Sequence, residues 1–370
     1  MNLPIRRRLA GRHGPAALFR SLLAVGVLCG IACGVQAETD PAYGRLITNS
    51  AIAVDSHTHK VYAVDEPEDM VSVTDEETGS LHMLKVGQAP IALAVNSDTD
   101  RIYVVNADSE SISVIDGKRD LVIATIPVQS GSHPYTIAVD EATDKIYATN
   151  TYSNSLTVID GVTNKVSNFE TGSADGIAID QRSNTVFLMT YEDPDIRIVD
   201  GFTGAVAKVG VGAHIWGIAF DKSSGTLYVG HTEADDVVAL NERTRAVTAI
   251  RVGSIPCALA VNSRTQEVYV VNYGSQTVSV INPKLGKVIA TLPVGRHPQA
   301  VAVDSVRNRI YVANVHSDSI TAIDGVRNTV IGTYHAGTNP YALAVDPATG
   351  QVYTANFGQP AVTAIRIAQK

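Results

Sequence analysis

The chain has 370 residues, of which 45% are apolar, 6% aromatic and 18% charged, and its formal net charge is −8. This length is enough to bury one large core or several small ones. Leucine and methionine are sparse beside valine, isoleucine, threonine and tyrosine, a bias that favours half-buried strands. No segment keeps a helical period, which excludes a mainly helical fold.

The first 37 residues are typical of a secretory signal peptide. Five arginines lie before an apolar run from Leu22 to Val35. A cleavage site of small residues follows the run and ends at Ala37. The run is too short and too rich in glycine to favour a spanning helix, so we expect no transmembrane segment after its removal. A lipoprotein with its lipid on Cys33 is the alternative. The mature chain is expected to begin near Glu38 and to be periplasmic, extracellular or bound at the cell surface.

Removal of residues 1–37 changes the charge and the cysteine content. Five of the 29 basic residues leave, so 24 basic residues face 37 acidic ones and the mature net charge is −13. A surface this acidic repels phosphate backbones and argues against nucleic acid as the main partner. Cys257 then stands alone in an apolar run, and is expected to be a small buried side chain rather than a reactive thiol.

Residues 38–370 are predicted to form a single domain of eight repeats. A short apolar run recurs every 40 to 44 residues and ends at Asp55, Asn96, Asp140, Asp180, Asp221, Asn262, Asp304 and Asp346. Each repeat continues with further runs of β-forming residues between clusters of Gly, Asn and Asp, which is typical of strands and hairpins. In the second repeat these runs span residues 102–106, 111–116 and 122–128.

Eight copies of a four-stranded antiparallel unit predict an all-β, eight-bladed β-propeller. A seven-bladed ring is the alternative, but it would leave one repeat unplaced. The last repeat has three strand-like runs before the chain ends, the third at residues 362–365. We expect its fourth strand to come from around Tyr43 to Ile47. The N- and C-terminal strands would then share the closing blade and leave no exposed sheet edge.

The repeats resemble a known family. Tyr-Val-Val-Asn occurs at 103–106 and 269–272, Tyr-Val-Ala-Asn at 311–314, and Val-Ile-Asp-Gly at 114–117 and 158–161. Over about residues 44 to 368 the chain is similar to YVTN-repeat β-propellers, and within them to the YncE-like exported propellers of bacteria. The resemblance implies the fold but no single activity, because relatives include adhesion modules, DNA-binding proteins, lactonases and a metal-dependent streptogramin lyase.

The residues that recur are interpreted as structural. An Asp or Asn ends every first strand, and an Asn ends the second strand in five repeats, at Asn106, Asn150, Asn272, Asn314 and Asn356. Such short polar side chains can hydrogen-bond the backbone of a turn. Function is therefore expected where the repeats differ from one another.

Two series of positions differ in this way. Seven residues before the end of each first strand stand Thr48, Ala89, His133, Ser173, His214, Ile255, His297 and Asn339. Two residues further on stand Ser50, Ile91, Tyr135, Asp175, Trp216, Cys257, Gln299 and Tyr341. Because an extended chain has a period of two, both series are expected to face the central funnel together. Rings and imidazoles in a funnel indicate a ligand site.

The loop after the second strand opens on the same face and adds His231 and His316, with Tyr152, Tyr191, Tyr273 and Phe357. The candidate ligand-binding residues are therefore His133, Tyr135, His214, Trp216, His231, His297, His316 and Tyr341. The alternative for the His-Pro pairs at 133–134 and 297–298 is a turn in which the ring bonds a neighbouring carbonyl.

No metal site is predicted among these histidines. Alternate blades stand about 90° apart, which places their imidazoles too far from one another for a single zinc ion. No cofactor is evident. A divalent cation at the acidic loop of Glu233, Asp235 and Asp236 is possible, although its ligands show no regular spacing.

These observations favour a non-catalytic binding or interaction module for a protein or small-molecule ligand. The sequence has no nucleophile elbow, phosphate loop or zinc-protease motif. The alternatives are a lactonase or lyase for a small cyclic substrate, with His133, His214 or His297 as base or metal ligand, and DNA binding like that of YncE-like relatives.

Overall fold

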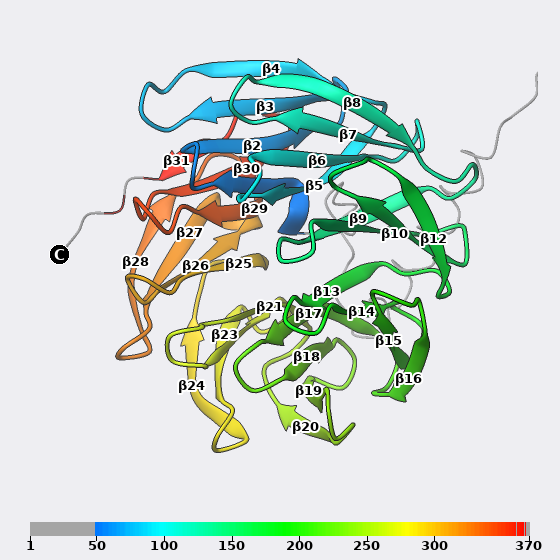
Figure 1. The fold of residues 1–370 in the computed structure, drawn as a ribbon. Coiled ribbons are helices and arrows are strands. Elements are labelled where there is room, and N and C mark those ends of the chain that lie inside the picture. Colours follow the sequence, from blue (N-terminus) through cyan, green and yellow to red (C-terminus); the bar gives the residue numbers. More distant parts are fainter. Residues whose placement is uncertain (1–48, 360, 366, 368–370) are drawn as a thin grey trace, which may run out of the picture. The chain divides into compact units, whose positions relative to one another are not determined.

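A computed structural model describes residues 49–359, 361–365 and 367, in which every regular element is a strand apart from two short 3-10 turns. The strands form eight antiparallel sheets in chain order, seven with four strands and the last with three. Each sheet is one blade (Figure 1). The prediction of an eight-bladed, all-β propeller is confirmed, and the seven-bladed alternative is wrong.

In each blade the strands run outward in sequence order. Blades 1 to 4 consist of β1 (Ile52–Asp55), β2 (Lys60–Asp65), β3 (Met70–Asp75), β4 (Leu81–Lys85); β5 (Pro90–Asn96), β6 (Arg101–Asn106), β7 (Ser111–Asp116), β8 (Leu121–Pro127); β9 (Pro134–Asp140), β10 (Lys145–Asn150), β11 (Ser155–Asp160), β12 (Val166–Glu170); and β13 (Gly176–Asp180), β14 (Thr185–Met189), β15 (Asp195–Asp200), β16 (Val206–Gly210). The turn η3 (Asn49–Ala51) precedes blade 1.

The second half repeats the pattern. Blades 5 to 8 consist of β17 (Ile215–Asp221), β18 (Thr226–His231), β19 (Asp236–Asn241), β20 (Val247–Arg251); β21 (Pro256–Val261), β22 (Val268–Asn272), β23 (Thr277–Asn282), β24 (Lys287–Pro293); β25 (Pro298–Asp304), β26 (Arg309–Asn314), β27 (Ser319–Asp324), β28 (Thr329–His335); and β29 (Pro340–Val345), β30 (Val352–Asn356), β31 (Thr363–Ile365). The turn η4 (Val315–Ser317) lies between β26 and β27.

The ring closes where blade 8 meets blade 1. Strands β29 and β1 contact each other (Figure 1). The described part of blade 8 has three strands. The expected fourth strand at residues 43–47 lies outside the described residues, as does the signal peptide at 1–37, so both stay predictions. In the described part of the chain, no helix has the length and apolar character needed to cross a membrane.

Strand direction divides the loops between two faces. Because neighbouring strands are antiparallel, the turns after the first and third strands of a blade lie together, on what we call the turn face. The loops after the second strands and the connections between blades lie at the other end, on the connection face. The two faces carry different side chains, described below.

The recurring Asp and Asn residues are structural, as expected. At the end of the first strands, Asp55, Asn96 and Asp140 accept a hydrogen bond from the backbone N–H two residues later, at 3.0–3.1 Å. At the end of the second strands, the side-chain amide of the Asn bonds side chains of the third strand. The Asn106 Nδ2 donates to the hydroxyls of Ser111 and Ser113 at 3.1 and 3.0 Å.

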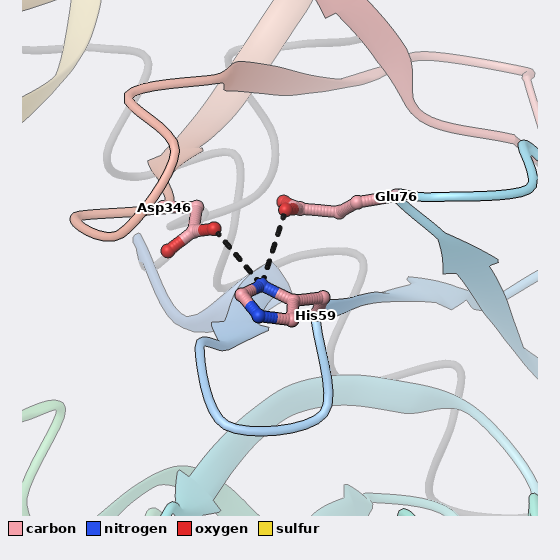
Figure 2. Close-up of side chains that lie close together, drawn as sticks. All are labelled: His59, Glu76 and Asp346. Carbon is pink, nitrogen blue, oxygen red and sulfur yellow. Dashed lines mark ion pairs between the residues drawn. The ribbon is translucent and has the colours of Figure 1, made fainter.

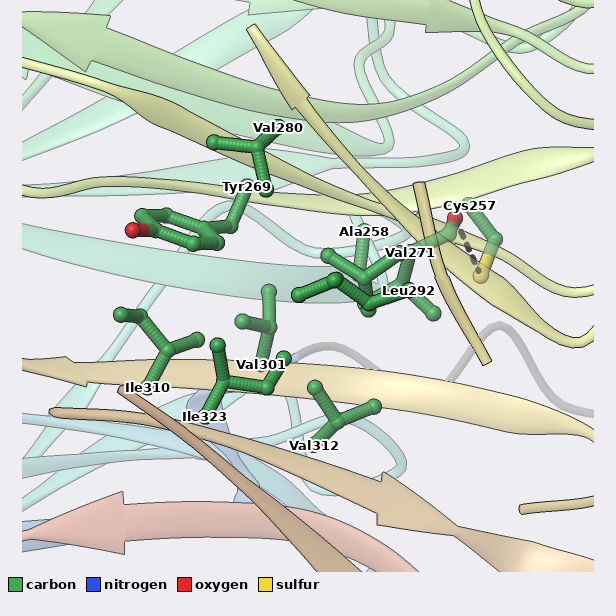
Figure 3. Close-up of a cluster of buried hydrophobic side chains, with 11 residues drawn as sticks. Cys257, Ala258, Tyr269, Val271, Val280, Leu292, Val301, Ile310, Val312 and Ile323 are labelled. Carbon is green, nitrogen blue, oxygen red and sulfur yellow. Dashed lines mark hydrogen bonds between the residues drawn. The ribbon is translucent and has the colours of Figure 1, made fainter. Parts of the chain in front are cut away.

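The hydrophobic core is divided among the junctions, a junction being the boundary between two consecutive blades. Eight buried clusters are present, each made by two neighbouring blades. Figure 3 shows the cluster at the 6–7 junction, which includes Tyr269, Leu292 and Ile310. Period-two alternation explains this, because side chains on opposite faces of one strand enter different junctions.

Cys257 belongs to the 6–7 cluster. It is a free, buried cysteine, with its Sγ 3.6 Å from the carbonyl oxygen of Val271 and 3.5 Å from that of Pro298. Burial raises the pKa of the thiol to about 12. The prediction of a small buried side chain is confirmed.

The 8–1 junction has the smallest side chains in its core. Its buried cluster consists of Ala51, Ile52, Val61, Ala63, Ala342, Tyr353 and Ala355. The 1–2 cluster has the same number of members but contains no alanine among them. Among the described residues, the buried cluster that closes the ring is therefore made of smaller apolar side chains than its neighbour, and burial of apolar surface is the main stabilising force.

Candidate functional site

All eight predicted site residues lie on the connection face. His133 and Tyr135 stand at the start of blade 3, His214, Trp216 and His231 in blade 5, His297 and His316 in blade 7, and Tyr341 in blade 8. His231 ends β18 and His316 lies within η4. Apart from His231, which is buried, all are half-buried.

The three histidines before the first strands adopt a left-handed backbone conformation. The φ angles are 48° at His133, 60° at His214 and 48° at His297. Ala89 and Ile255 have φ of 50° and 55° at the same register, so the conformation belongs to the connection between blades rather than to histidine. Histidine is one of the residues that tolerate it.

The backbone carbonyls at these positions also have a repeated role. The carbonyl oxygen of His133 accepts a hydrogen bond from the N–H of Thr151 at 3.1 Å, and that of His214 accepts one from Thr232 at 3.0 Å. Each bond ties the start of a first strand to the loop after the second strand of the same blade. These bonds come from the backbone and do not depend on the imidazole, so the imidazoles are described by their own contacts.

A β-bulge follows the left-handed residue. In blade 8, Pro340 pairs with Asn356 and Ala342 with Ala355, which leaves Tyr341 as the extra residue. Blade 5 has a shift between Ile215 and Ile218 that contains Trp216. The expectation of a regular extended chain between the two series is therefore wrong, because a left-handed residue and a bulge re-aim the side chains.

The rings meet in groups around the connection face. His133 stacks on Tyr152 with centroids 4.9 Å apart, and His297 stacks on Tyr273 at 4.6 Å and 8°. The other contacts are Tyr191 with His214 at 5.4 Å and with Trp216 at 6.4 Å, His297 with His316 at 4.1 Å, and Tyr341 with Phe357 at 4.7 Å. Blades 3 to 8 thus all contribute rings to these contacts. The sequence predicted that the rings share one face, but it did not predict which rings contact each other.

Blade 5 carries two imidazole–carboxylate pairs. The Nδ1 of His214 lies 2.8 Å from the Oε2 of Glu233, and the Nδ1 of His231 lies 2.8 Å from the Oδ1 of Asp236. The Nε2 of His231 is buried and has no hydrogen-bond partner in the described structure. His214 is the more accessible of the two, with 37% of its side chain exposed. A carboxylate on one ring nitrogen orients an imidazole for proton transfer at the other.

A second polar group lies at blades 3 and 4. Burial, and then the charge of Asp175, raise the pKa of Tyr135 well above its ordinary value. Burial also raises the pKa of Asp175, whose Oδ2 accepts the N–H of Tyr191 at 3.1 Å. The buried Arg197 donates to the hydroxyl of Thr190 at 2.7 Å. These polar groups are poorly hydrated, which strengthens their interactions.

The three histidines that precede first strands do not converge on one point. His133, His214 and His297 each contact a different ring, and the described residues contain a single group of three metal-type donors, to which none of them belongs. That group is His59, Glu76 and Asp346 on the turn face of the 8–1 junction. Sequence reasoning missed it.

Figure 2 shows how these three side chains meet. The Nδ1 of His59 lies 3.6 Å from the Oδ2 of Asp346 and 3.9 Å from the Oε2 of Glu76, and all three donor atoms lie within 4.8 Å of one another. His59 comes from the turn between β1 and β2, Glu76 directly follows β3, and Asp346 directly follows β29. The carboxylates are almost fully buried, with exposed side-chain fractions of 5% and 0%.

The carboxyl groups of this cluster compete for a proton. Burial, and then the neighbouring Asp346, raise the pKa of Glu76 to about 7. Burial also disfavours the charged form of Asp346, but hydrogen bonds from the N–H of Ala348, from Glu76 and from Thr349 leave its pKa below the ordinary value. Two buried carboxyls in contact disfavour each other's charged form, which explains why the two shifts have opposite directions.

A signal for this cluster is present in the repeat. His59 stands where other repeats have Asp100, Asp144, Asn184, Gly225, Gln266, Asn308 and Gly350. Glu76 stands where four others have Gly117, Gly161, Gly201 and Gly325. A search for departures on the turn face, combined with ring closure, would have found both residues.

Comparison with known proteins agrees with this fold. The model of the YNCE-like β-propeller family matches residues 129–368. None of the curated proteins matches the chain.

Solved structures share the architecture at low sequence identity. They include the hydrazine synthase of Kuenenia stuttgartiensis, with a TM-score of 0.61, 20% identity, and coverage of 91% of this chain and 99% of that one. The dihydro-heme d1 dehydrogenase NirN has a TM-score of 0.68, 12% identity, and coverage of 80% and 68%. A virginiamycin B lyase from Staphylococcus aureus has a TM-score of 0.59, 14% identity, and coverage of 72% and 92%. Identities this low show the fold alone.

The match over residues 129–368 covers more than half of the chain and includes the repeats that carry most of the ring contacts. The chain belongs to the YNCE-like β-propeller family.

Proposed function

We propose that this chain is an exported binding module, periplasmic or at the cell surface, whose ligand site is the connection face of blades 3 to 8. The ring contacts carry the proposal. Half-buried Tyr, Trp and His rings on one face offer flat apolar surface and polar edges, which is what recognition of a planar or sugar-like ligand needs.

Two properties favour binding over the alternatives in the sequence. The mature charge of −13 disfavours a phosphate backbone, so DNA is a poor partner. The imidazoles of blades 3, 5 and 7 also have separate ring partners, which suits a broad contact surface better than a single reaction centre. Salt-sensitive retardation of DNA at physiological ionic strength would contradict the first point.

The test is a thermal-shift screen of the mature protein with neutral sugars and aromatic lactones, followed by calorimetry on any hit. A ligand that binds only the folded state raises the Tm. Tyr273→Ala and His297→Ala should each weaken a hit by about two- to tenfold, because a stacked ring contributes about 0.5–1.5 kcal/mol beyond its buried area.

Phe202→Ala is the matched control. Phe202 is an aromatic side chain with 63% of its surface exposed, and it lies in the turn between β15 and β16 on the turn face. It should leave affinity unchanged. A hit that loses affinity with Phe202→Ala and keeps it with Tyr273→Ala would move the site to the other face.

A second function, a lactonase or lyase, is favoured by one observation. The pair of His214 and Glu233 has the geometry of an oriented general base. A variant of the structurally similar virginiamycin B lyase that carries a His→Ala change is described as catalytically inactive and was solved with quinupristin. Chromatography with tandem mass spectrometry of quinupristin incubated with this chain tests the idea, because hydrolysis of the lactone adds one water whereas elimination gives a ring-opened isomer of unchanged mass. Turnover should vanish in His214→Ala and persist in His335→Ala, whose histidine is exposed on an outer strand.

Export rests on residues 1–37. N-terminal sequencing of the protein secreted by a bacterial host should start near Glu38, and deletion of residues 1–37 should keep the protein in the cytoplasm. An intact Met1 on the secreted protein, or a lipid on Cys33, would contradict this cleavage site.

A further inference from the structure

The His59, Glu76 and Asp346 cluster belongs to the repeat architecture but differs chemically from its counterparts. At the 2–3 junction the amide of Asn96 donates to the Oδ1 of Asp144 at 2.7 Å, and at the 3–4 junction the hydroxyl of Tyr147 donates to the Oδ1 of Asn184 at 2.7 Å. Each of these junctions joins a donor to an acceptor. At the 8–1 junction two carboxyls and an imidazole meet instead.

Glycine is the usual residue at the position of Glu76 because space is short there. A Cβ at Gly161 would lie 2.3 Å from the Oδ1 of Asp144, and a Cβ at Gly325 would lie 2.5 Å from the Oδ1 of Asn308. Blade 1 departs at both positions at once, with His59 in place of the Asp or Asn and Glu76 in place of the Gly. The paired departure places two metal-type donors where blades 2, 3, 4 and 7 have an Asp or Asn beside a Gly.

Two donor atoms of the cluster lack hydrogen bonds in the described structure. They are the Oε1 of Glu76 and the Nδ1 of His59, both buried. A buried polar atom without a partner costs about 1–3 kcal/mol. Among the described residues no lysine or arginine forms an ion pair with Glu76 or Asp346. Apart from the imidazole of His59, the carboxylates therefore have no cationic partner among the described residues.

We propose that His59, Glu76 and Asp346 bind a divalent transition-metal ion of the Zn²⁺ class, which clasps blade 8 to blade 1. One imidazole and two carboxylates form a three-ligand set that leaves a position open for water. The imidazole favours Zn²⁺ over Mg²⁺ and Ca²⁺, which take oxygen ligands. The three donor atoms lie within 4.8 Å of one another, so small rotations of the side chains bring them to bonding distance.

The clasp has a structural role. Asp346 belongs to the last repeat and His59 and Glu76 to the first, so the ion cross-links the two ends of the ring. The same junction has the alanine-rich core and three described strands in blade 8. A metal bond at this place stabilises the folded chain without contact to the connection face.

The test uses the mature, tag-free protein, first stripped with a chelator. Titration with Zn²⁺ should show one site per chain and raise the Tm by about 4 °C at a 100-fold excess over Kd. Mg²⁺ should give no shift. Co²⁺ in the same site should give visible d–d absorption, which reports its coordination directly. A stripped wild-type protein that binds no Zn²⁺ would overturn the proposal, whether or not any variant folds.

Variants taken from other repeats keep the fold intact. His59→Asn and Glu76→Gly reproduce the residues of blades 4 and 7, and each should weaken Zn²⁺ binding on the order of 100-fold. Glu242→Gly is the matched control, because Glu242 occupies the register of Glu76 in blade 5. His133→Ala, His214→Ala and His297→Ala together should leave the zinc response unchanged. A response that survives His59→Asn, or that disappears in the triple variant, would place the ion elsewhere and overturn the proposal.

Discussion

The 1–2 and 8–1 junctions have different residues at the same four positions of the repeat. At the 1–2 junction these are Asp55, Tyr62, Asp100 and Gly117, and at the 8–1 junction they are Asp346, Tyr353, His59 and Glu76. Each set contains two carboxyl groups that face the junction. The two junctions differ in the cationic partners of the acidic side chains around these positions.

The 1–2 junction carries its own cations. Asp100 lies 2.8 Å from the Nδ1 of His57 and 2.5 Å from the Nζ of Lys118. The Nζ of Lys60 lies 2.8 Å from both carboxylate oxygens of Asp120 and donates to the carbonyl of Gly117 at 2.8 Å. Neutralised carboxylates are compatible with burial, whereas uncompensated ones are not. At the 8–1 junction, by contrast, no lysine or arginine among the described residues forms an ion pair with Glu76 or Asp346, and the proposed ion would take that place.

The largest expected effect tests the cores of the two junctions. Ile102→Ala, at a fully buried position of the 1–2 cluster, should lower the free energy of unfolding by about 3 kcal/mol. Ile52→Ala at the 8–1 junction should cost less, because its alanine-rich surroundings near the end of the chain can relax around the cavity. Urea unfolding curves measure both. Equal losses would contradict the view that the closing core is the weaker one.

A second effect tests the internal cations. Lys60→Met should lower the free energy of unfolding by about 2 kcal/mol, because it removes charged hydrogen bonds to Asp120 and to the carbonyl of Gly117. Added Zn²⁺ should not restore the loss. Restoration by Zn²⁺ would mean that the 1–2 junction also accepts a metal ion, and the contrast between the junctions would fail.

A third effect is a pH dependence at the 1–2 junction. Burial opposes ionisation of Asp100, but the hydrogen bonds from Lys118 and His57 outweigh it and hold its pKa below the ordinary value. A lowered carboxyl pKa adds stability that is present above the unfolded pKa, near 3.8, and is lost as the pH falls through the folded pKa. Asp100→Asn should therefore flatten the fall of Tm below about pH 4. If the Tm of Asp100→Asn falls as steeply below pH 4 as that of the wild type, the ionisation of Asp100 does not contribute to stability.

The smallest expected effect concerns Cys257, whose reactivity measures how well the 6–7 junction, between two consecutive repeats, is closed. With a thiol pKa of about 12, the thiolate fraction at pH 8 is on the order of 10⁻⁴. A thiol reagent should not label the native protein within an hour, should label it fully in guanidinium, and should be indifferent to Zn²⁺. Rapid labelling that Zn²⁺ suppresses would show that the clasp governs more than its own junction.

The sequence was sufficient for the fold because the repeat determines it. The Asp or Asn that ends each first strand fixes the copy number, and its turn hydrogen bonds recur in the structure. The order of the strands also predicted that the candidate rings lie on one face. The strand order did not predict which rings contact each other. For example, His297 stacks on Tyr273 of the preceding blade, and this contact depends on the packing between blades.

Two features could not be predicted from local pattern. The left-handed residue before the first strand of blades 2, 3, 5, 6, 7 and 8 can be His, Ala, Ile or Asn, so composition gives no sign of it. The cluster of His59, Glu76 and Asp346 joins opposite ends of the chain, and no spacing rule connects residues that meet only through ring closure. The expected strand at residues 43–47 stays a prediction.

The division of the core among the junctions also has a consequence for the history of the protein. Because each cluster is built by two adjacent blades, duplication of one repeat adds one blade and one core at the same time. Loss of a repeat removes both. The number of blades can then drift between descendants without redesign of any core, and the only place that must adapt to each new count is the join between the last copy and the first.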